Sequence, residues 1–158
     1  MKASVEQEAQ LIERMLTFRD LPLDCARYSF PWGESGTALA TIPDLAPWQI
    51  DELGALQDHL CKVRVWLEQG IVPPEQLFRA AWSSGRGLYK TALMAILAHW
   101  HVSSHLGGLT ILAANSETQL RTRIVPEYAF WFGAAINAHW WLVEGMRIVG
   151  IDFRDGIL

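Results

Sequence analysis

The chain has 158 residues, of which 51% are hydrophobic and eight are tryptophan, so a disordered protein is excluded and one domain with a sizeable core is expected. The formal net charge of −4 excludes bulk attraction to nucleic acid, and any DNA contact would need a local basic patch. Two distant cysteines, a polar N-terminus and the lack of an apolar run of about 18 residues predict a reduced protein with no signal peptide and no membrane span.

Residues 1–46 are predicted to form an N-terminal helix and loop region. Ser4 and Gln7 have the spacing of a capping box, and apolar residues recur at helical spacing from there to residue 17. A break over residues 20–24 leaves room for a short turn of helix through Tyr28. Prolines and glycines then predict a loop up to residue 46.

A second helix is predicted to begin at Pro47, because proline suits the first position of a helix and the residues that follow have one apolar face. This helix is expected to reach about Leu60, or to extend as far as Trp66. Gly70 and the two prolines at positions 73 and 74 close it.

Two apolar segments and the helix between them determine the predicted fold class. Phe78–Trp82 and Leu109–Ala114 are short apolar runs, and the second is apolar on both faces, as in a buried strand. An apolar helix is predicted between them over Thr91–His101. Strand, crossover helix and strand make a βαβ unit, so we expect an α/β fold with a parallel sheet core flanked by helices.

The last part of the chain is predicted to hold one more helix and a short sheet. Ser116 and Gln119 form a second capping box, which starts the helix. Pro126 is expected to kink or restart it, because proline removes a backbone hydrogen bond. Residues 140–152 are predicted to form one or two strands, with breaks at the glycines.

The segment Ser83–Thr91, between the first predicted strand and its helix, has the layout of a phosphate-binding loop. Small residues let backbone N–H groups close around a polyphosphate, and the helix N-terminus adds partial positive charge. Lys90 would reach the β- and γ-phosphates, and the Thr91 hydroxyl would bind Mg²⁺. Against the pattern G-x-x-x-x-G-K-[ST], Ser84 and Tyr89 replace the two glycines. The alternative is a glycine-rich turn before a buried helix, in which Lys-Thr has no such role.

Four motifs follow one another along the chain: Phe30–Gly33, Pro47–Gln49, Ser84–Thr91 and Ala113–Arg121. In this order they resemble the N-terminal part of the large terminase subunit of tailed bacteriophages. The resemblance implies an ATP-driven DNA-packaging motor in which a P-loop ATPase domain precedes a metal-dependent nuclease domain. Residues 47–158 would then be the N-terminal part of the P-loop ATPase domain.

The resemblance also implies roles for individual residues. Gln49 would read adenine, a task that suits an amide because it donates and accepts hydrogen bonds together. Arg86 would stabilise the transferring phosphoryl group. Asn115 and Gln119 match a helicase-like segment that couples nucleotide state to DNA, while their alternative role is helix capping. The implied nucleotide-binding residues are Gln49, Ser84, Gly85, Arg86, Gly87, Lys90 and Thr91, of which Lys90 and Arg86 would be catalytic.

The chain departs from the family pattern at two places. Tyr89 stands where the family has a glycine, and its side chain is expected to hinder the approach of a phosphate. The family also has a second acidic motif of four apolar residues and Asp-Glu, whereas Asp152 is followed by Phe153. We therefore interpret Asp152 as a strand-end residue rather than a metal ligand. The chain is expected to be a fragment or truncated form of a terminase that is inactive alone.

The cofactors implied by the resemblance are ATP and Mg²⁺. The implied partners of the full-length family are double-stranded phage DNA, the portal and the small terminase subunit, in the cytoplasm of the bacterial host. Two other functions remain open, namely another helicase-like P-loop ATPase and a nucleotide-free structural or interaction protein with a degenerate loop. His99, His101 and His105 have no companion ligand at metal-binding spacing and are interpreted as core or surface residues.

Overall fold

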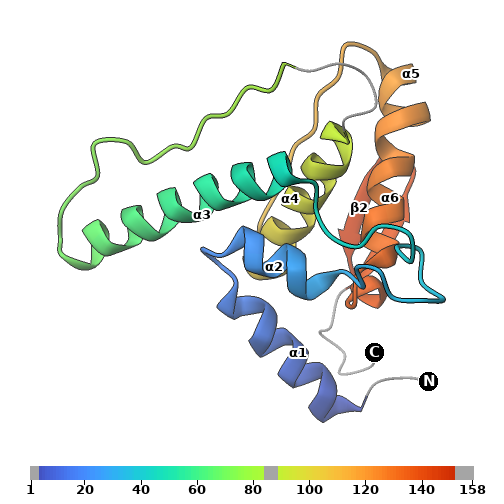
Figure 1. The fold of residues 1–158 in the computed structure, drawn as a ribbon, viewed down its shortest axis with the longest axis horizontal. Helices are drawn as coiled ribbons and strands as arrows, with labels where there is room; N and C mark the ends of the chain where they lie inside the picture. Colours follow the sequence, from blue (N-terminus) through green and yellow to red (C-terminus); the bar gives the residue numbers. More distant parts are fainter. Residues whose placement is uncertain (1–3, 84–88, 152–158) are drawn as a thin grey trace.

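The computed structural model describes residues 4–83 and 89–151, and their architecture is mainly helical (Figure 1). The longer helices are α1 (Val5–Thr17), α2 (Pro22–Ser29), α3 (Pro47–Glu68), α4 (Lys90–Ser104) and α6 (Val125–Ala134). The shorter elements are α5 (Glu117–Gln119), the π-turn η1 (Leu120–Ile124), the 3₁₀ turn η2 (Ala138–Trp140) and the strands β1 (Trp141–Glu144) and β2 (Arg147–Gly150).

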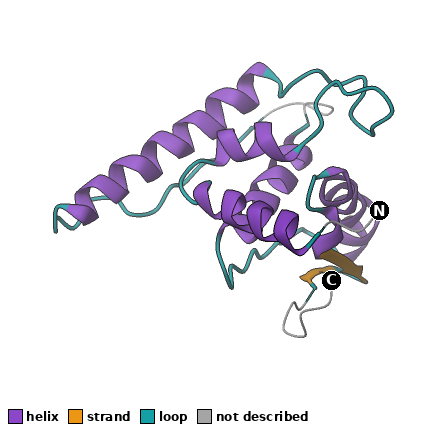
Figure 2. Ribbon diagram, turned by 90° about the horizontal axis from the view of Figure 1, so that it is seen from below, coloured by secondary structure: helices purple, strands orange, loops and turns teal. Residues whose placement is uncertain are grey.

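The prediction of an α/β fold with a parallel sheet core is wrong. Within the described ranges the only sheet is the antiparallel hairpin of β1 and β2, which lies at one side of the helices (Figure 2). The segments 78–82 and 109–114 contain neither helix nor strand. A strand requires a hydrogen-bonded neighbour, and neither segment makes a backbone–backbone hydrogen bond to any described residue. Both segments are therefore irregular chain without a strand partner in residues 4–83 and 89–151.

The N-terminal helices begin where the sequence predicted. The Ser4 hydroxyl accepts from the Gln7 N–H at 3.2 Å and the Gln7 side chain accepts from the Ser4 N–H at 2.9 Å, which confirms the capping box. Pro47 is the first residue of α3, also as predicted. This helix continues to Glu68, two residues beyond the longer expectation, and it projects from the rest of the molecule (Figure 1).

Helix α2 has no side-chain cap of its own at Leu21, and α3 supplies one instead. The Gln57 amide oxygen accepts from the N–H groups of Leu23 at 3.2 Å and Asp24 at 3.5 Å. The Gln57 NH₂ group donates to the Asp24 carboxylate at 3.2 Å. Because the first N–H groups of a helix have no partner within the helix, this contact fixes α2 on α3.

Helix α4 is the centre of the fold. Its apolar residues Leu93, Ala95 and Ile96 are buried, and the helix contacts α1, α2 and α6. The helix predicted over Thr91–His101 is thus confirmed, and it extends three residues further, to Ser104. A helix that is apolar on nearly all sides needs neighbours on all sides, and these three helices provide them.

The segment before α6 shows the effect of Pro126. Ser116 caps α5 by accepting from the Gln119 N–H at 3.2 Å, as predicted from the second capping box. The chain then passes through the π-turn η1, after which α6 begins at Val125. Since proline has no N–H to give to an i−4 carbonyl, a local change of helical pitch ahead of it is expected. The predicted restart of the helix is confirmed.

Candidate functional site

The residues of the predicted nucleotide site lie in two parts of the chain. Ser84, Gly85, Arg86 and Gly87 fall outside the described residues, and so does Asp152. Gln49, Lys90 and Thr91 are described. They belong to the first turns of two different helices, α3 and α4. The structure brings these first turns together across 40 positions of sequence.

Gln49 makes the contact between the two helices. Its NH₂ group donates to the Tyr89 carbonyl oxygen at 3.3 Å, immediately before Lys90. Its amide oxygen accepts from the Ala46 N–H at 2.9 Å and so caps the start of α3. The side chain is buried, with 5% of Gln49 exposed. The residue assigned to adenine therefore also holds the start of α4 against the start of α3.

Lys90 and Thr91 are the first two residues of α4, a position that suits phosphate binding. Tyr89, the N-cap residue of this helix, makes no side-chain capping hydrogen bond. The helix has 15 residues, long enough for its dipole to favour an anion at this end. The phosphate-binding role of Lys90 and Thr91 stays a prediction that their positions at the start of α4 suit.

Tyr89 precedes α4 in the left-handed conformation, with φ of 54° and ψ of 29°. Among the described residues it is the one non-glycine residue with positive φ. Glycine adopts this conformation at little cost, which is a physical reason for a glycine at this point of the pattern. The Tyr89 side chain is 65% exposed. Its aromatic ring therefore points outward, and the strain lies in the backbone.

Asn115 and Gln119, predicted to couple nucleotide state to DNA, are both exposed. The Gln119 N–H donates to the Ser116 hydroxyl, which is the capping geometry of α5. Their coupling role stays a prediction.

A buried polar cluster at the centre of the fold was not predicted. The His99 Nε2 lies 2.7 Å from the Asn137 Oδ1 and 3.3 Å from the Ser103 hydroxyl. The Asn137 NH₂ group donates to that hydroxyl at 3.1 Å. Burial lowers the pKa of His99 to about 4, and the hydrogen bond to Asn137 opposes this shift only in part. His99 is thus a neutral core residue, which confirms the interpretation as a core histidine.

Serine, histidine and asparagine in contact also occur where a hydroxyl is activated as a nucleophile. Here His99 and Asn137 are fully buried and Ser103 nearly so, and a substrate has no path to the hydroxyl. Cys25 is likewise fully buried, and burial raises the pKa of its thiol to about 11. These groups therefore stabilise the core and do not form a catalytic site.

A second unpredicted cluster joins the two ends of the described chain. The buried Glu8 carboxylate, on α1, lies 2.9 Å from the His139 Nε2 and accepts from the Trp140 indole N–H. The Trp100 indole N–H donates to the Phe18 carbonyl at 2.7 Å and ties α4 to the end of α1. No local sequence pattern could have revealed either contact, because more than 80 residues separate the partners.

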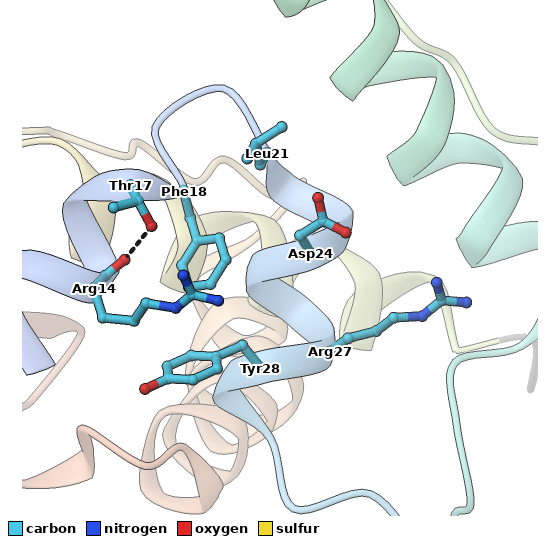
Figure 3. A pocket seen from close by; sticks show the side chains of 7 residues that line it. All are labelled: Arg14, Thr17, Phe18, Leu21, Asp24, Arg27 and Tyr28. Atoms are coloured by element: carbon cyan, nitrogen blue, oxygen red, sulfur yellow. Dashed lines mark hydrogen bonds between the residues drawn. The ribbon is translucent and has the colours of Figure 1, made fainter.

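A shallow hollow of about 570 Å³ lies beside α1 and α2 and contains two arginines (Figure 3). The Arg14 guanidinium lies 4.8 Å from the centre of the Phe18 ring and 5.3 Å from that of Tyr28. Arg27 points away from Arg14 and pairs with Asp44 at 3.8 Å. The two cations do not converge, so this hollow lacks the geometry of an anion site.

Comparison of the chain with protein-family models, with curated proteins and with solved structures found no match. Within the described ranges, no helix has the length and apolar character needed to cross a membrane. The same ranges contain no group of three or more His, Cys, Asp or Glu side chains placed to hold a metal ion.

Proposed function

We propose that this chain carries a nucleotide-binding element of the large-terminase type and belongs to an ATP-driven motor that packages phage DNA. The proposal is supported by the order of the four motifs in the sequence. The single observation that carries it is the hydrogen bond from Gln49 to the Tyr89 carbonyl. The two motifs assigned to adenine and to phosphate are far apart in sequence, yet their helices begin side by side.

Gln49 keeps hydrogen-bonding capacity for adenine after its internal contacts are made. A primary amide has two N–H donors and two acceptor lone pairs. One donor is used by the Tyr89 carbonyl and one lone pair by the Ala46 N–H. One donor and one lone pair remain, which is the complement of an adenine edge. A small opening between the starts of α3 and α4 would let the base reach them.

Lys90 and Thr91 would act on the phosphates. The Lys90 ammonium would neutralise charge on the β- and γ-phosphates, and the Thr91 hydroxyl would be a ligand of Mg²⁺. Catalysis of phosphoryl transfer also requires a second metal-holding acid and a group that orients water. We therefore propose that the 158-residue chain binds nucleotide without appreciable turnover.

The proposed function implies the partners of the terminase family. These are double-stranded phage DNA, the portal and the small terminase subunit, in the cytoplasm of the bacterial host. Arg86 would stabilise the transferring phosphoryl group, and Asn115 with Gln119 would relay the nucleotide state.

Calorimetric titration with ATP and Mg²⁺ tests the nucleotide site. Because Tyr89 is already left-handed without nucleotide, its backbone strain is the same in the free and the bound chain, and Tyr89→Gly is expected to bind nucleotide within about twofold of the unaltered chain. In the Tyr89→Gly background, Lys90→Ala should weaken binding more than about tenfold. Thr91→Val should weaken it in a Mg²⁺-dependent way. Thr91→Ser, which keeps the hydroxyl, is the matched control and should bind normally.

A second function, a structural or interaction protein that binds no nucleotide, is favoured by the burial of Gln49 and by its two internal hydrogen bonds. In this case the amide serves only to join α3 and α4. Equal binding or no binding by all five proteins would support this second function. ATP turnover that is lost in Lys90→Ala would instead contradict the proposed lack of catalysis.

A further inference from the structure

Two histidines meet at the C-terminal end of α4. His101 lies in the last turn of the helix, and His105 is the residue that ends it. Residues four positions apart lie on one face of a helix, and the centres of these two imidazole rings are 4.9 Å apart. Lys90 and Thr91 are at the opposite end of α4, so the inference below is independent of the proposed function.

Hydrogen bonds fix the tautomer of His105. Its Nδ1 lies 3.1 Å from the His101 carbonyl oxygen, which can only accept, so this nitrogen carries the proton. The Ser104 hydroxyl donates to the Trp100 carbonyl at 2.6 Å and can therefore accept from the same Nδ1, 3.0 Å away. The Nε2 of His105 then presents a lone pair. An imidazole whose other N–H is held by a carbonyl is the usual form of a metal-binding histidine.

His101 is also held through its Nδ1, which lies 3.0 Å from the Thr110 hydroxyl oxygen. Within the described residues, the Nε2 atoms of His101 and His105 make no hydrogen bond, and neither atom is sealed from solvent. Both side chains are half-buried. Two ring nitrogens on one face of α4 are therefore open to a ligand from outside the chain.

The distance between the rings suits a shared metal ion. With metal–nitrogen bonds of about 2.0–2.1 Å, the centres of two imidazoles on one tetrahedral or square-planar ion lie about 4.5–5.2 Å apart. The 4.9 Å between His101 and His105 falls in this range. Burial lowers the pKa of His105 and the neighbouring His101 lowers it further, which favours the neutral imidazole that a metal requires.

We propose that His101 and His105 form a two-histidine site for a divalent transition-metal ion, bound through the two Nε2 atoms with water in the remaining positions. The described residues contain no group of three or more metal-binding side chains, so the protein supplies two ligands. Imidazole suits Cu²⁺, Ni²⁺ and Zn²⁺, of which Cu²⁺ binds most tightly, whereas Mg²⁺ prefers oxygen ligands. The ion would join the last turn of α4 to the residue that ends it.

Calorimetric titration of the full chain with Cu²⁺ at neutral pH tests the proposal. One ion is expected to bind with a dissociation constant below about 0.1 mM, Zn²⁺ should bind more weakly, and Mg²⁺ should not bind. His101→Gln and His105→Gln should each weaken Cu²⁺ binding more than about tenfold, because each leaves a single imidazole. The matched control is His139→Gln, at a histidine whose side chain is 45% exposed, and it should bind Cu²⁺ normally.

Two further measurements accompany the titration. Electron paramagnetic resonance of the Cu²⁺-loaded unaltered chain should show two nitrogen ligands, a result that needs no variant. Cu²⁺ should also raise the melting temperature of the unaltered chain and of His139→Gln, but not that of His101→Gln or His105→Gln, because an ion that binds only the folded chain stabilises it. Circular dichroism confirms that each variant is folded.

Three results would overturn the proposal. The first is no Cu²⁺ binding at about 0.1 mM, and the second is a resonance spectrum without two nitrogen ligands. The third is binding that is unchanged in both His101→Gln and His105→Gln. If binding were instead lost in His139→Gln, the ion would be assigned to His139 and the neighbouring Glu8 carboxylate.

Discussion

The helical centre around α4 and the two non-helical segments, residues 72–83 and 109–115, differ in how far their polar groups are hydrogen-bonded within the chain. Around α4, His99 and Asn137 are fully buried and hydrogen-bonded to each other, while the buried His99 Nδ1 and Tyr128 hydroxyl have no hydrogen-bond partner among the described residues. In the segments 72–83 and 109–115, no backbone group is hydrogen-bonded to the backbone of another described residue. We infer that stability resides in the helical centre, whereas the two segments are free to bind other molecules.

The largest effect that would test this comparison is expected at Asn137. Asn137→Ala removes the Asn137 contacts of the His99 Nε2 and of the Ser103 hydroxyl, and leaves these two buried groups with only their 3.3 Å contact to each other. We expect the free energy of unfolding in urea to fall by about 4 kcal/mol, because two buried hydrogen bonds are lost and a small cavity is left in the core.

The matched control is Asn115→Ala, at an exposed asparagine of the second non-helical segment. Its effect should remain within about 0.5 kcal/mol. Equal effects at the two asparagines would contradict the division between a paired centre and open segments.

The second expected effect is on pH dependence. The pKa of His99 falls from 6.5 to about 4 on folding, so the unfolded chain takes up a proton that the folded chain does not. The stabilisation is fully present above pH 6.5 and is lost as the pH falls from 6.5 towards 4, by about 3 kcal/mol in all.

Urea unfolding at pH values between 7.5 and 4.5 measures this effect. His99→Gln keeps a hydrogen-bonding side chain that cannot be protonated, and the other titrating groups are common to both proteins. Subtraction of the two curves therefore isolates His99. Parallel curves would show that the imidazole becomes protonated without opening the core.

Sequence patterns predicted those features that depend on neighbouring residues. The cap at Ser4, the helix start at Pro47 and the break at Gly145, a glycine with φ of 61° between β1 and β2, are all local and were correct. The contact between His99 and Asn137 joins positions 38 residues apart, and no sequence pattern around either residue predicts it. Such contacts depend on how helices pack and not on periodicity.

The error in the predicted sheet has a related cause. Phe78, Ala80 and Trp82 line one small cavity together with residues of α3 and α4, so alternate residues of this segment face the helices, as in a strand. The apolar pattern thus correctly indicated that one face of this segment packs against the core. Such a segment forms a strand only if a second segment lies beside it and exchanges backbone hydrogen bonds with it. A single apolar run does not show whether that second segment exists.

For the candidate site, the resemblance placed Gln49 and Lys90 in one site, and the structure places the helices that carry them in contact. The hydrogen bond itself could not be predicted. It uses the backbone carbonyl of Tyr89, whose position depends on a left-handed conformation that only the structure reveals.

A smaller effect is expected at Gln57, which caps α2 from α3. Gln57→Ala removes the acceptor of two N–H groups and should lower the free energy of unfolding by about 1 kcal/mol, the usual loss for an N-cap. Gln57→Glu keeps the acceptor but places a carboxylate beside Asp24, and should recover only part of this loss. Gln76→Ala, in the first non-helical segment, is the control and should have no measurable effect.

The smallest effect, and the one that connects both parts of the molecule, is expected at Tyr89. This residue ends the segment of open chain and begins α4, and its left-handed backbone costs about 1–2 kcal/mol relative to glycine. Glycine also has more freedom in the unfolded chain, which offsets about 0.5–1 kcal/mol of the relief. Tyr89→Gly should therefore stabilise the fold by only about 0.5 kcal/mol, measured by urea unfolding. Tyr89→Ala keeps the strained φ and should give no gain, whereas Tyr89→Asn, which tolerates this conformation, should lie between the two. A clear loss of stability in Tyr89→Gly would mean that the exposed tyrosine ring makes a stabilising contact, and that the start of α4 is held by its side chain rather than by the Gln49 hydrogen bond.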